Sequence, residues 1–169
     1  MKIALITGAS QGIGSAIAKE LNQKKIKVIL VARSKFKLKK IQTSLKFPKN
    51  SIIISKDLRS LSACNSIGAK IKKLNYLINV AGATKGGSFL KLKDNVWDDG
   101  FNLKFKAAVR LSRNFWKTLR RNKGKVINIG GGAARIPSHT FMIGGAVNSA
   151  LNNFSRALAM QGKIDKVSV

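Results

Sequence analysis

The sequence predicts an α/β protein built on a doubly wound parallel sheet of the Rossmann type, with helices on both faces in three αβα layers. Short and almost continuous apolar runs are typical of strands that are buried on both faces. These runs alternate along the whole chain with longer segments of helical periodicity, and right-handed crossovers then wind the sheet. The 169 residues suit a single domain, residues 1–169, without a linker or an internal repeat.

Each element follows from its local pattern. Strands are predicted where the apolar runs are short, at residues 3–7, 27–32, 51–55, 76–80 and 125–129, and a last strand barely begins at 167–169. Helices are predicted where apolar residues recur every three or four positions, as at Ile13, Ile17 and Leu21. They span residues 13–24, 35–45, 61–73, 94–121 and 141–160.

Composition excludes several classes of protein. The one cysteine, Cys64, cannot form an internal disulfide, which excludes a disulfide-stapled secreted scaffold. No apolar run approaches the roughly 20 residues of a membrane helix. The apolar N-terminus ends at Thr7-Gly8, short of the roughly 7–15 residue core of a signal peptide. We therefore expect a cytoplasmic protein.

The charge balance is extreme, because 33 Lys and Arg stand against 6 Asp and Glu, for a net charge of +27. Such a surface attracts nucleic acid, anionic membranes and phosphorylated ligands. The lysines are spread along the whole chain, however, and no aromatic residues interleave them as a base-stacking platform requires. A basic polyanion-binding module is therefore an alternative to be weighed against a simple solvated surface.

A glycine-rich turn joins the first predicted strand to the first predicted helix. It reads Thr7-Gly8-Ala9-Ser10-Gln11-Gly12-Ile13-Gly14, with glycines spaced G-x-x-x-G-x-G. Glycines let the backbone approach a ligand closely, and a helix N-terminus offers free N–H groups to a phosphate. The place of the turn between a strand and a helix favours a dinucleotide site over a purely structural turn.

With further segments in the same order, this turn resembles the short-chain dehydrogenase/reductase family. Residues 7–14 match that family's T-G-x-x-x-G-x-G cofactor motif, and Asn79-Val80-Ala81-Gly82 resembles its N-N-A-G motif. Asp57-Leu58 resembles the pair that contacts adenine, and Trp97 with Phe101-Asn102-Leu103 resembles the segment that carries the catalytic Asn. The resemblance implies a nicotinamide dinucleotide cofactor held by Gly8, Ser10, Gln11, Gly12, Ile13, Gly14, Asp57, Leu58, Asn79, Ala81 and Gly82.

The end of the second strand indicates which dinucleotide fits. By the resemblance, Ala32 stands where an acidic residue would hold the ribose 2′-hydroxyl of NAD. Arg33 follows it, and a guanidinium can bind a 2′-phosphate bidentately, with Ser34 adding a hydroxyl. Lys35 and Lys37 add positive charge nearby. We therefore expect NADP(H) rather than NAD(H), against the alternative that Arg33 only begins a solvated basic face.

The family's catalytic groups are absent from the positions that the resemblance assigns to them. The Ser position falls on Gly131, the Tyr position on Gly144 and the Lys position on Asn148. In the family the Tyr is the general acid/base and the Lys lowers its pKa, whereas the chain's one tyrosine, Tyr76, lies in a strand. No metal site is predicted, and the candidate catalytic residues are Asn102, His139 and Asn148.

Three functions stay open. One is an oxidoreductase that transfers a hydride between NADP(H) and an alcohol or carbonyl substrate with altered proton-transfer groups. Another is a catalytically silent NADP-binding sensor or partner subunit, and the third is the polyanion-binding module. Each makes a different prediction, namely turnover, binding without turnover, or binding of nucleic acid that depends steeply on salt.

The resemblance also carries two expectations about the whole molecule. Family members usually form subunit interfaces through the helices predicted at 94–121 and 141–160, so a homo-oligomer is expected. An apolar surface on the first of these helices would come from Val109, Leu111, Phe115, Trp116 and Leu119. Family members usually continue beyond the last helix, so we expect a truncated chain that lacks the last strands and has an exposed sheet edge.

Overall fold

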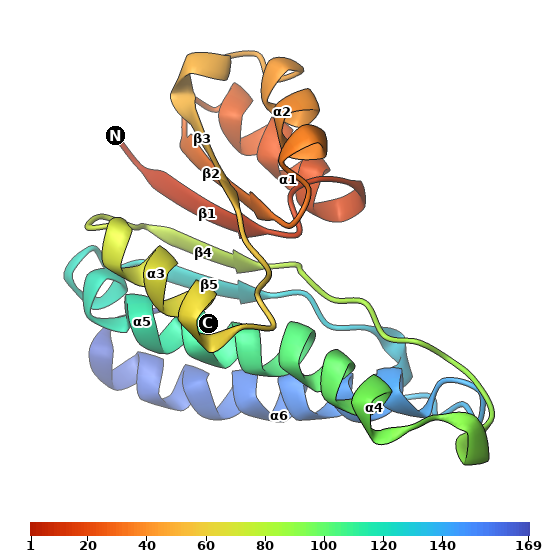
Figure 1. Cartoon of the computed structure of the whole chain (residues 1–169). Helices are drawn as coiled ribbons and strands as arrows, with labels where there is room; N and C mark the ends of the chain where they lie inside the picture. Colours follow the sequence, from red (N-terminus) through yellow and green to blue (C-terminus); the bar gives the residue numbers. More distant parts are fainter.

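A five-stranded parallel sheet forms the centre of the computed structural model, which describes residues 1–169 (Figure 1). The strands are β1 (Ile3–Thr7), β2 (Lys27–Ala32), β3 (Ser51–Ser55), β4 (Tyr76–Asn79) and β5 (Lys125–Asn128). Their order across the sheet is β3-β2-β1-β4-β5, and every neighbouring pair is parallel. This order confirms the doubly wound prediction and places the carboxyl ends of all strands at one edge.

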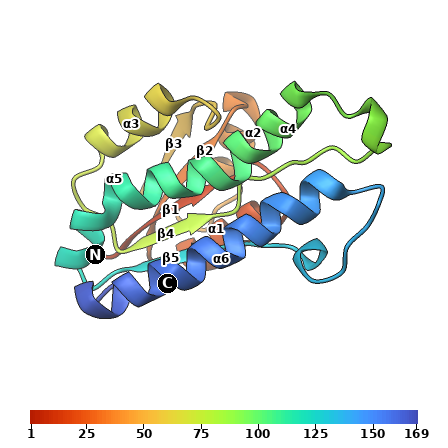
Figure 2. The ribbon, with the colours of Figure 1, turned by 90° about the horizontal axis from the view of Figure 1, so that it is seen from below.

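Helices cover both faces of the sheet, as Figures 1 and 2 show. One face carries α1 (Gly12–Gln23) and α2 (Lys35–Thr43), and the other carries α3 (Leu61–Lys70), α5 (Ala107–Arg121) and α6 (Met142–Asp165). A short helix, α4 (Asp94–Gly100), leads into α5. No helix of the chain is both long and apolar enough to cross a lipid bilayer.

The core consists of two apolar layers, because successive strand residues face opposite sides of the sheet. In β1, Leu5 packs toward α3 and α5, while Ala4 and Ile6 pack toward α1 and α2. The single cysteine, Cys64 of α3, is fully buried in the first layer. Its thiol donates to the carbonyl of Leu58 at 3.4 Å, and burial raises its pKa.

The apolar face expected at a subunit interface is largely used inside the chain. Leu111, Phe115 and Leu119 of α5 have no exposed surface and belong to the core layer beneath α3 and α5. Trp116 is partly buried against the same layer. Packing on the sheet therefore accounts for most of this face without a partner.

The prediction of one helix at 94–121 is wrong in one respect, because this segment is not a uniform α-helix. Between α4 and α5 the segment Phe101–Lys106 is a π-helix. Its backbone bond runs from the N–H of Ala107 to the carbonyl of Asn102, five residues earlier. A π-turn inserts one extra residue into a helix, so residues on either side change their relative register.

Other boundaries shift by a few residues. The helices predicted to reach 45 and 73 end at Thr43 and Lys70, while α6 extends beyond residue 160 to Asp165. After α6, the predicted last strand is reduced to a parallel bridge between Ser168 and Lys125 of β5. Helix and strand ends are set by capping contacts that apolar periodicity does not encode.

Candidate functional site

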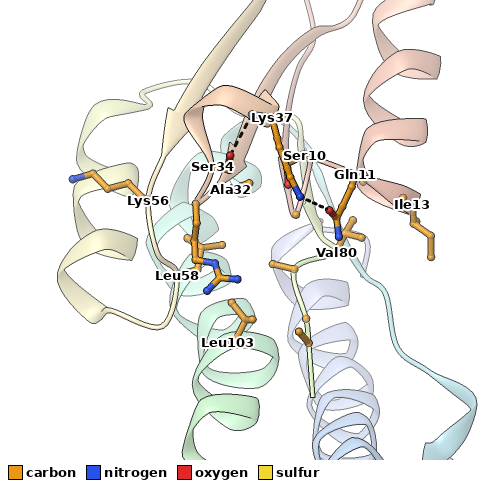
Figure 3. A pocket seen from close by; sticks show the side chains of 17 residues that line it. Ser10, Gln11, Ile13, Ala32, Ser34, Lys37, Lys56, Leu58, Val80 and Leu103 are labelled. Atoms are coloured by element: carbon orange, nitrogen blue, oxygen red, sulfur yellow. Dashed lines mark hydrogen bonds between the residues drawn. The ribbon is translucent and has the colours of Figure 1, made fainter. Parts of the chain in front are cut away.

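A cleft of about 480 Å³ opens at the carboxyl edge of the sheet, where β1 and β4 diverge (Figure 3). Its volume lies within the roughly 300–1,000 Å³ of small-molecule sites. Segments that follow β1, β2, β3 and β4 form its walls, and the π-helix adds one residue. The lining residues are Gly8, Ser10, Gln11, Gly12, Ile13, Gly14, Ala32, Arg33, Ser34, Lys37, Lys56, Leu58, Val80, Ala81, Gly82, Ala83 and Leu103.

The glycine-rich turn has the backbone that its sequence predicts. Gly8 and Gly12 adopt left-handed φ angles of 65° and 53°, which side chains disfavour. A Cβ at Gly14 would overlap the carbonyl oxygen of Gly8, so glycine there lets α1 start directly against the end of β1. The N-terminus of α1 therefore faces the cleft with little side-chain bulk in front of it.

Thr7 joins the two walls of the cleft. Its hydroxyl oxygen accepts hydrogen bonds from the backbone N–H groups of Val80 and Ala81, at 2.9 and 3.0 Å. The close approach leaves no room for a side chain at Gly8, where a Cβ would lie 3.0 Å from the nitrogen of Ala81. The turn after β1 and the segment after β4 are thus held as one unit.

The charge that lines the cleft is entirely positive. Arg33, Lys37 and Lys56 line it, and no Asp or Glu does. The ammonium of Lys37 donates to the side-chain oxygen of Gln11 at 3.3 Å, which links α2 to the glycine-rich turn (Figure 3). Ser34 caps α2 by accepting the N–H of Lys37 at 3.3 Å, so its own O–H stays available as a donor. This end of the cleft suits an anionic ligand.

Two residues predicted to hold the cofactor lie outside the lining. The carboxylate of Asp57 accepts the backbone N–H and the guanidinium of Arg59, both at 3.0 Å. Asn79 is buried and donates to the side-chain oxygen of Asn128 at 2.8 Å, and Asn128 in turn donates to Ser155 of α6 at 2.8 Å. Both residues therefore brace the segments that carry Leu58 and Ala81.

Sequence reasoning missed several lining residues. Lys56 directly precedes Asp57 at the end of β3, and the rule that ligands bind at the carboxyl ends of parallel strands could have found it. Val80 lies within the Asn79–Gly82 motif, and Ala83 directly follows it. Leu103 reaches the cleft from the π-helix, whose register the sequence does not reveal.

The structure brings Gly131, Gly144 and Asn148 together. A Cβ at Gly131 would lie 3.0 Å from the amide nitrogen of Asn148. That nitrogen donates to the carbonyl of Gly144 at 2.7 Å, while the amide oxygen of Asn148 is buried without a partner. A Cβ at Gly144 would overlap the ring of Phe141, so this ring fills the space beside the helix backbone. None of these groups transfers protons.

Like Asn148, the candidate catalytic residues Asn102 and His139 lie outside the cleft lining. Asn102 is half-buried in the π-helix. His139 is exposed in the loop before α6, beside the hydroxyls of Ser138 and Thr140, which lie 3.1 Å from each other.

A lysine that sequence reasoning did not select lies close to the cleft. Lys104 belongs to the π-helix and is half-buried. Its aliphatic stem runs along Gly82, where a Cβ would come within 2.8 Å of the Lys104 Cδ. Burial lowers the pKa of this lysine from its ordinary value. No sequence signal distinguishes it from the other lysines of the chain.

Comparisons with known proteins agree with this site. Residues 2–169 match the family described as short chain dehydrogenase. A 2,3-dihydro-2,3-dihydroxybenzoate dehydrogenase of Bacillus subtilis is 30% identical over 166 residues, which cover 95% of this chain and 64% of the relative. A short-chain dehydrogenase from Streptomyces avermitilis has a TM-score of 0.94 at 27% identity, over 100% of this chain and 64% of that one.

A metagenomic short-chain oxidoreductase, solved in complex with NADP, has a TM-score of 0.92 at 28% identity and covers 98% of this chain and 77% of its own. The chain spans between 52% and 67% of the length of the first four curated relatives that it matches. Within that span the family match runs almost from end to end and includes every segment of the cleft. The chain therefore belongs to the short-chain dehydrogenase family.

Proposed function

We propose that this protein binds NADP(H) in the cleft and transfers a hydride between that cofactor and an alcohol or carbonyl substrate. The proposal rests mainly on one observation. The same cleft contains the glycine-rich turn and three cationic side chains, and no carboxylate lines it. A nicotinamide dinucleotide with a 2′-phosphate matches both, because it offers a pyrophosphate to the turn and a further anion to the cations. The related oxidoreductase in complex with NADP supports the choice.

The residues present fit such a cofactor. The turn from Gly8 to Gly14, with the N-terminus of α1, would hold the pyrophosphate, because glycine at these two positions permits the close backbone packing that sets the helix N-terminus against the end of β1. Arg33 and Lys37 would hold the 2′-phosphate, with the O–H of Ser34 as a further donor. The bound cofactor would supply the hydride.

The remaining predicted residues would contact the adenine beside the 2′-phosphate and the ribose at the nicotinamide end. Leu58 would pack against the adenine, with Asp57 positioning it, and Ala81 and Gly82 would approach the ribose beside the nicotinamide. Asn148 would orient the substrate by a hydrogen bond, since its buried amide oxygen has no partner in the chain. The pair of Gly131 and Gly144 would leave this region without the family's hydroxyl groups.

A second function is favoured by the ring of Phe141, which fills the space at Gly144. If no other group transfers a proton there, the protein would bind NADP(H) without turnover, as a sensor or a partner subunit. Turnover with a panel of ketones and alcohols distinguishes the two functions. The same preparation, measured by light scattering, tests the expected homo-oligomer.

The cofactor assignment is tested by titrating NADPH and NADH into the protein at physiological salt and following nucleotide fluorescence. Arg33→Ala should weaken NADPH binding by about 10- to 100-fold, the equivalent of one charge-assisted hydrogen-bond pair, and change NADH binding little. Equal affinity for both nucleotides, unchanged in Arg33→Ala, would contradict the proposal.

A charge-matched control is needed, because NADPH carries one more phosphate than NADH and a protein of net charge +27 attracts it more strongly at any surface. Lys39→Ala removes the same charge from the exposed side of α2, outside the cleft. It should lower both affinities slightly and equally. A loss of NADPH selectivity in Lys39→Ala as large as that in Arg33→Ala would show general electrostatics instead of a 2′-phosphate site.

A further inference from the structure

Hydride transfer to a carbonyl needs a proton source near the reacting oxygen, and the expected positions offer none. Gly131 and Gly144 have no side chains, and the amide of Asn148 does not release a proton at neutral pH. His139, the chain's only histidine, is exposed in a loop outside the cleft lining. Another element beside the cleft, the π-helix, carries a group that can release a proton.

Lys104 of the π-helix is not one of the lining residues, but it lies directly behind two of them. Its neighbour Leu103 lines the cleft, and its own stem lies along Gly82, which also lines the cleft. One helical turn earlier, Gly100 packs so closely on α6 that a Cβ there would lie 2.8 Å from Ile143 and 3.8 Å from Val147. The π-helix that follows also packs on α6, where the rings of Phe105 and Phe154 lie edge to face with centroids 6.0 Å apart, so Lys104 belongs to an element between the segment after β4 and α6.

The ammonium of Lys104 is not committed to an acid elsewhere. The chain forms ion pairs through Lys24, Arg59 and Arg120 only. A half-buried ammonium without a carboxylate is costly, and it would gain by meeting an oxygen of a bound ligand. Burial also lowers the pKa of Lys104, which eases the release of a proton from Nζ.

We infer that Lys104 is the proton donor of this site, with its ε-ammonium hydrogen-bonded to the carbonyl oxygen of the substrate beside the nicotinamide end of the cleft. The inference rests on the proposed hydride transfer. As a hydride from the reduced dinucleotide forms the new C–H bond, the electron pair of the C=O π bond moves to oxygen. That oxygen takes a proton from Nζ, the N–H bond breaks, and the neutral amine regains a proton from water.

Two substitutions separate charge from proton transfer. Lys104→Met keeps an unbranched stem against Gly82 and removes the ammonium, whereas Lys104→Arg keeps a cation whose pKa is far too high for it to release a proton. Both should bind NADPH within a few-fold of wild type and lose carbonyl reduction by about 100-fold or more. Lys106→Met, at an exposed lysine of the same π-helix, should change neither property.

Chemical protection supplies a readout that does not depend on turnover. Each protein is treated with an amine-acylating reagent with and without NADPH, and the acylated peptides are counted by mass spectrometry. NADPH should protect Lys104 and leave Lys106 equally reactive. Urea unfolding of each variant checks that it folds, and Lys104→Met should be at least as stable as wild type because it buries no charge.

Each result decides one point. If NADPH does not bind the wild-type protein, both this inference and the proposed function are overturned. Binding without protection of Lys104 overturns this inference alone, as does full turnover by Lys104→Arg. Protection of Lys104 in a protein that reduces no carbonyl compound places the lysine at the cofactor but overturns its role as proton donor.

Discussion

The space beside residue 144 is filled by the side chain of another residue, Phe141. Its ring lies where a Cβ of residue 144 would be, so even alanine forces the ring to move. Within α6, whose first turn contains residue 144, alanine would otherwise be favoured over glycine, by up to about 1 kcal/mol. Gly144→Ala should instead destabilise the protein by about 1–3 kcal/mol, the usual cost of overpacking.

Urea unfolding measures this cost. The double variant Phe141→Ala/Gly144→Ala should lose less stability than the two single changes added together, because each change makes room for the other. Gly145→Ala is the matched control, since its Cβ would meet only the carbonyl of Ala133, at 3.3 Å. Additive effects of the two changes would show that the ring does not occupy this space.

Individual residues differ in how well the sequence predicts them. The glycines at 8, 12 and 14 could be predicted, because the turn requires left-handed φ angles or close backbone approach at those positions. The ring of Phe141 could not, since a glycine at 144 does not say what fills the space beside it. Lys104 could not be singled out either, because only folding distinguishes it from other lysines.

Between elements, Asp165 fastens the end of α6 to α5. One of its carboxylate oxygens accepts the indole N–H of Trp116 and the amide of Gln161, both at 2.8 Å, and the other pairs with Arg120 at 3.3 Å. The hydrogen bond from Trp116 is the main reason that the pKa of Asp165 is lowered. The folded protein therefore favours the ionised carboxylate more than the unfolded chain does.

This linkage gives a pH dependence with a definite sign. A carboxyl group whose pKa falls on folding contributes stability above its unfolded pKa, near 4, and loses that contribution as pH falls through its folded value. Asp165→Asn should therefore be less stable than wild type at pH 6–7, and the difference should shrink below pH 4. Urea unfolding across this range measures it.

The control for this pH series is Asp98→Asn, at an exposed residue of α4 without an ion pair. It should track wild type at every pH. A difference between Asp165→Asn and wild type that stays constant down to pH 2 would mean that the lost contacts do not depend on ionisation.

At the scale of elements, the sequence predicted the order and type of strands and helices but not the π-helix. Apolar periodicity identifies a helical face over several turns, and it is insensitive to one inserted residue. The insertion nevertheless changes the register of Asn102, Leu103 and Lys104, of which Leu103 lines the cleft. The candidate Asn102 therefore stays a prediction, and Lys104 could not be selected from the sequence because the helical register around it was not predicted.

For the molecule as a whole, the charge dominates. A net charge of +27 is opposed by only four ion pairs, so folding brings many like charges closer together. Salt screens exposed charges, with a Debye length that falls from about 30 Å at 0.01 M to about 10 Å at 0.1 M. The urea midpoint should rise between 10 mM and 200 mM NaCl.

An equal rise in KCl would identify screening as the cause, since a specific ion effect would separate the two salts. A midpoint that is flat or falls over this range would show that self-repulsion is not a significant cost in the folded state. The fold itself was predictable at this scale because alternation of buried strands and helices permits few topologies. The distribution of charge over the surface was not, since lysines occur throughout the chain.

The burial of Cys64 has a practical meaning for how this protein ages. With its only thiol inside the layer under α3, two folded molecules have no means of becoming joined through sulfur. A disulfide-linked dimer on a non-reducing gel therefore forms only from molecules that have unfolded enough to expose Cys64. Disulfide-linked dimers of Cys64 therefore report earlier unfolding without an added label.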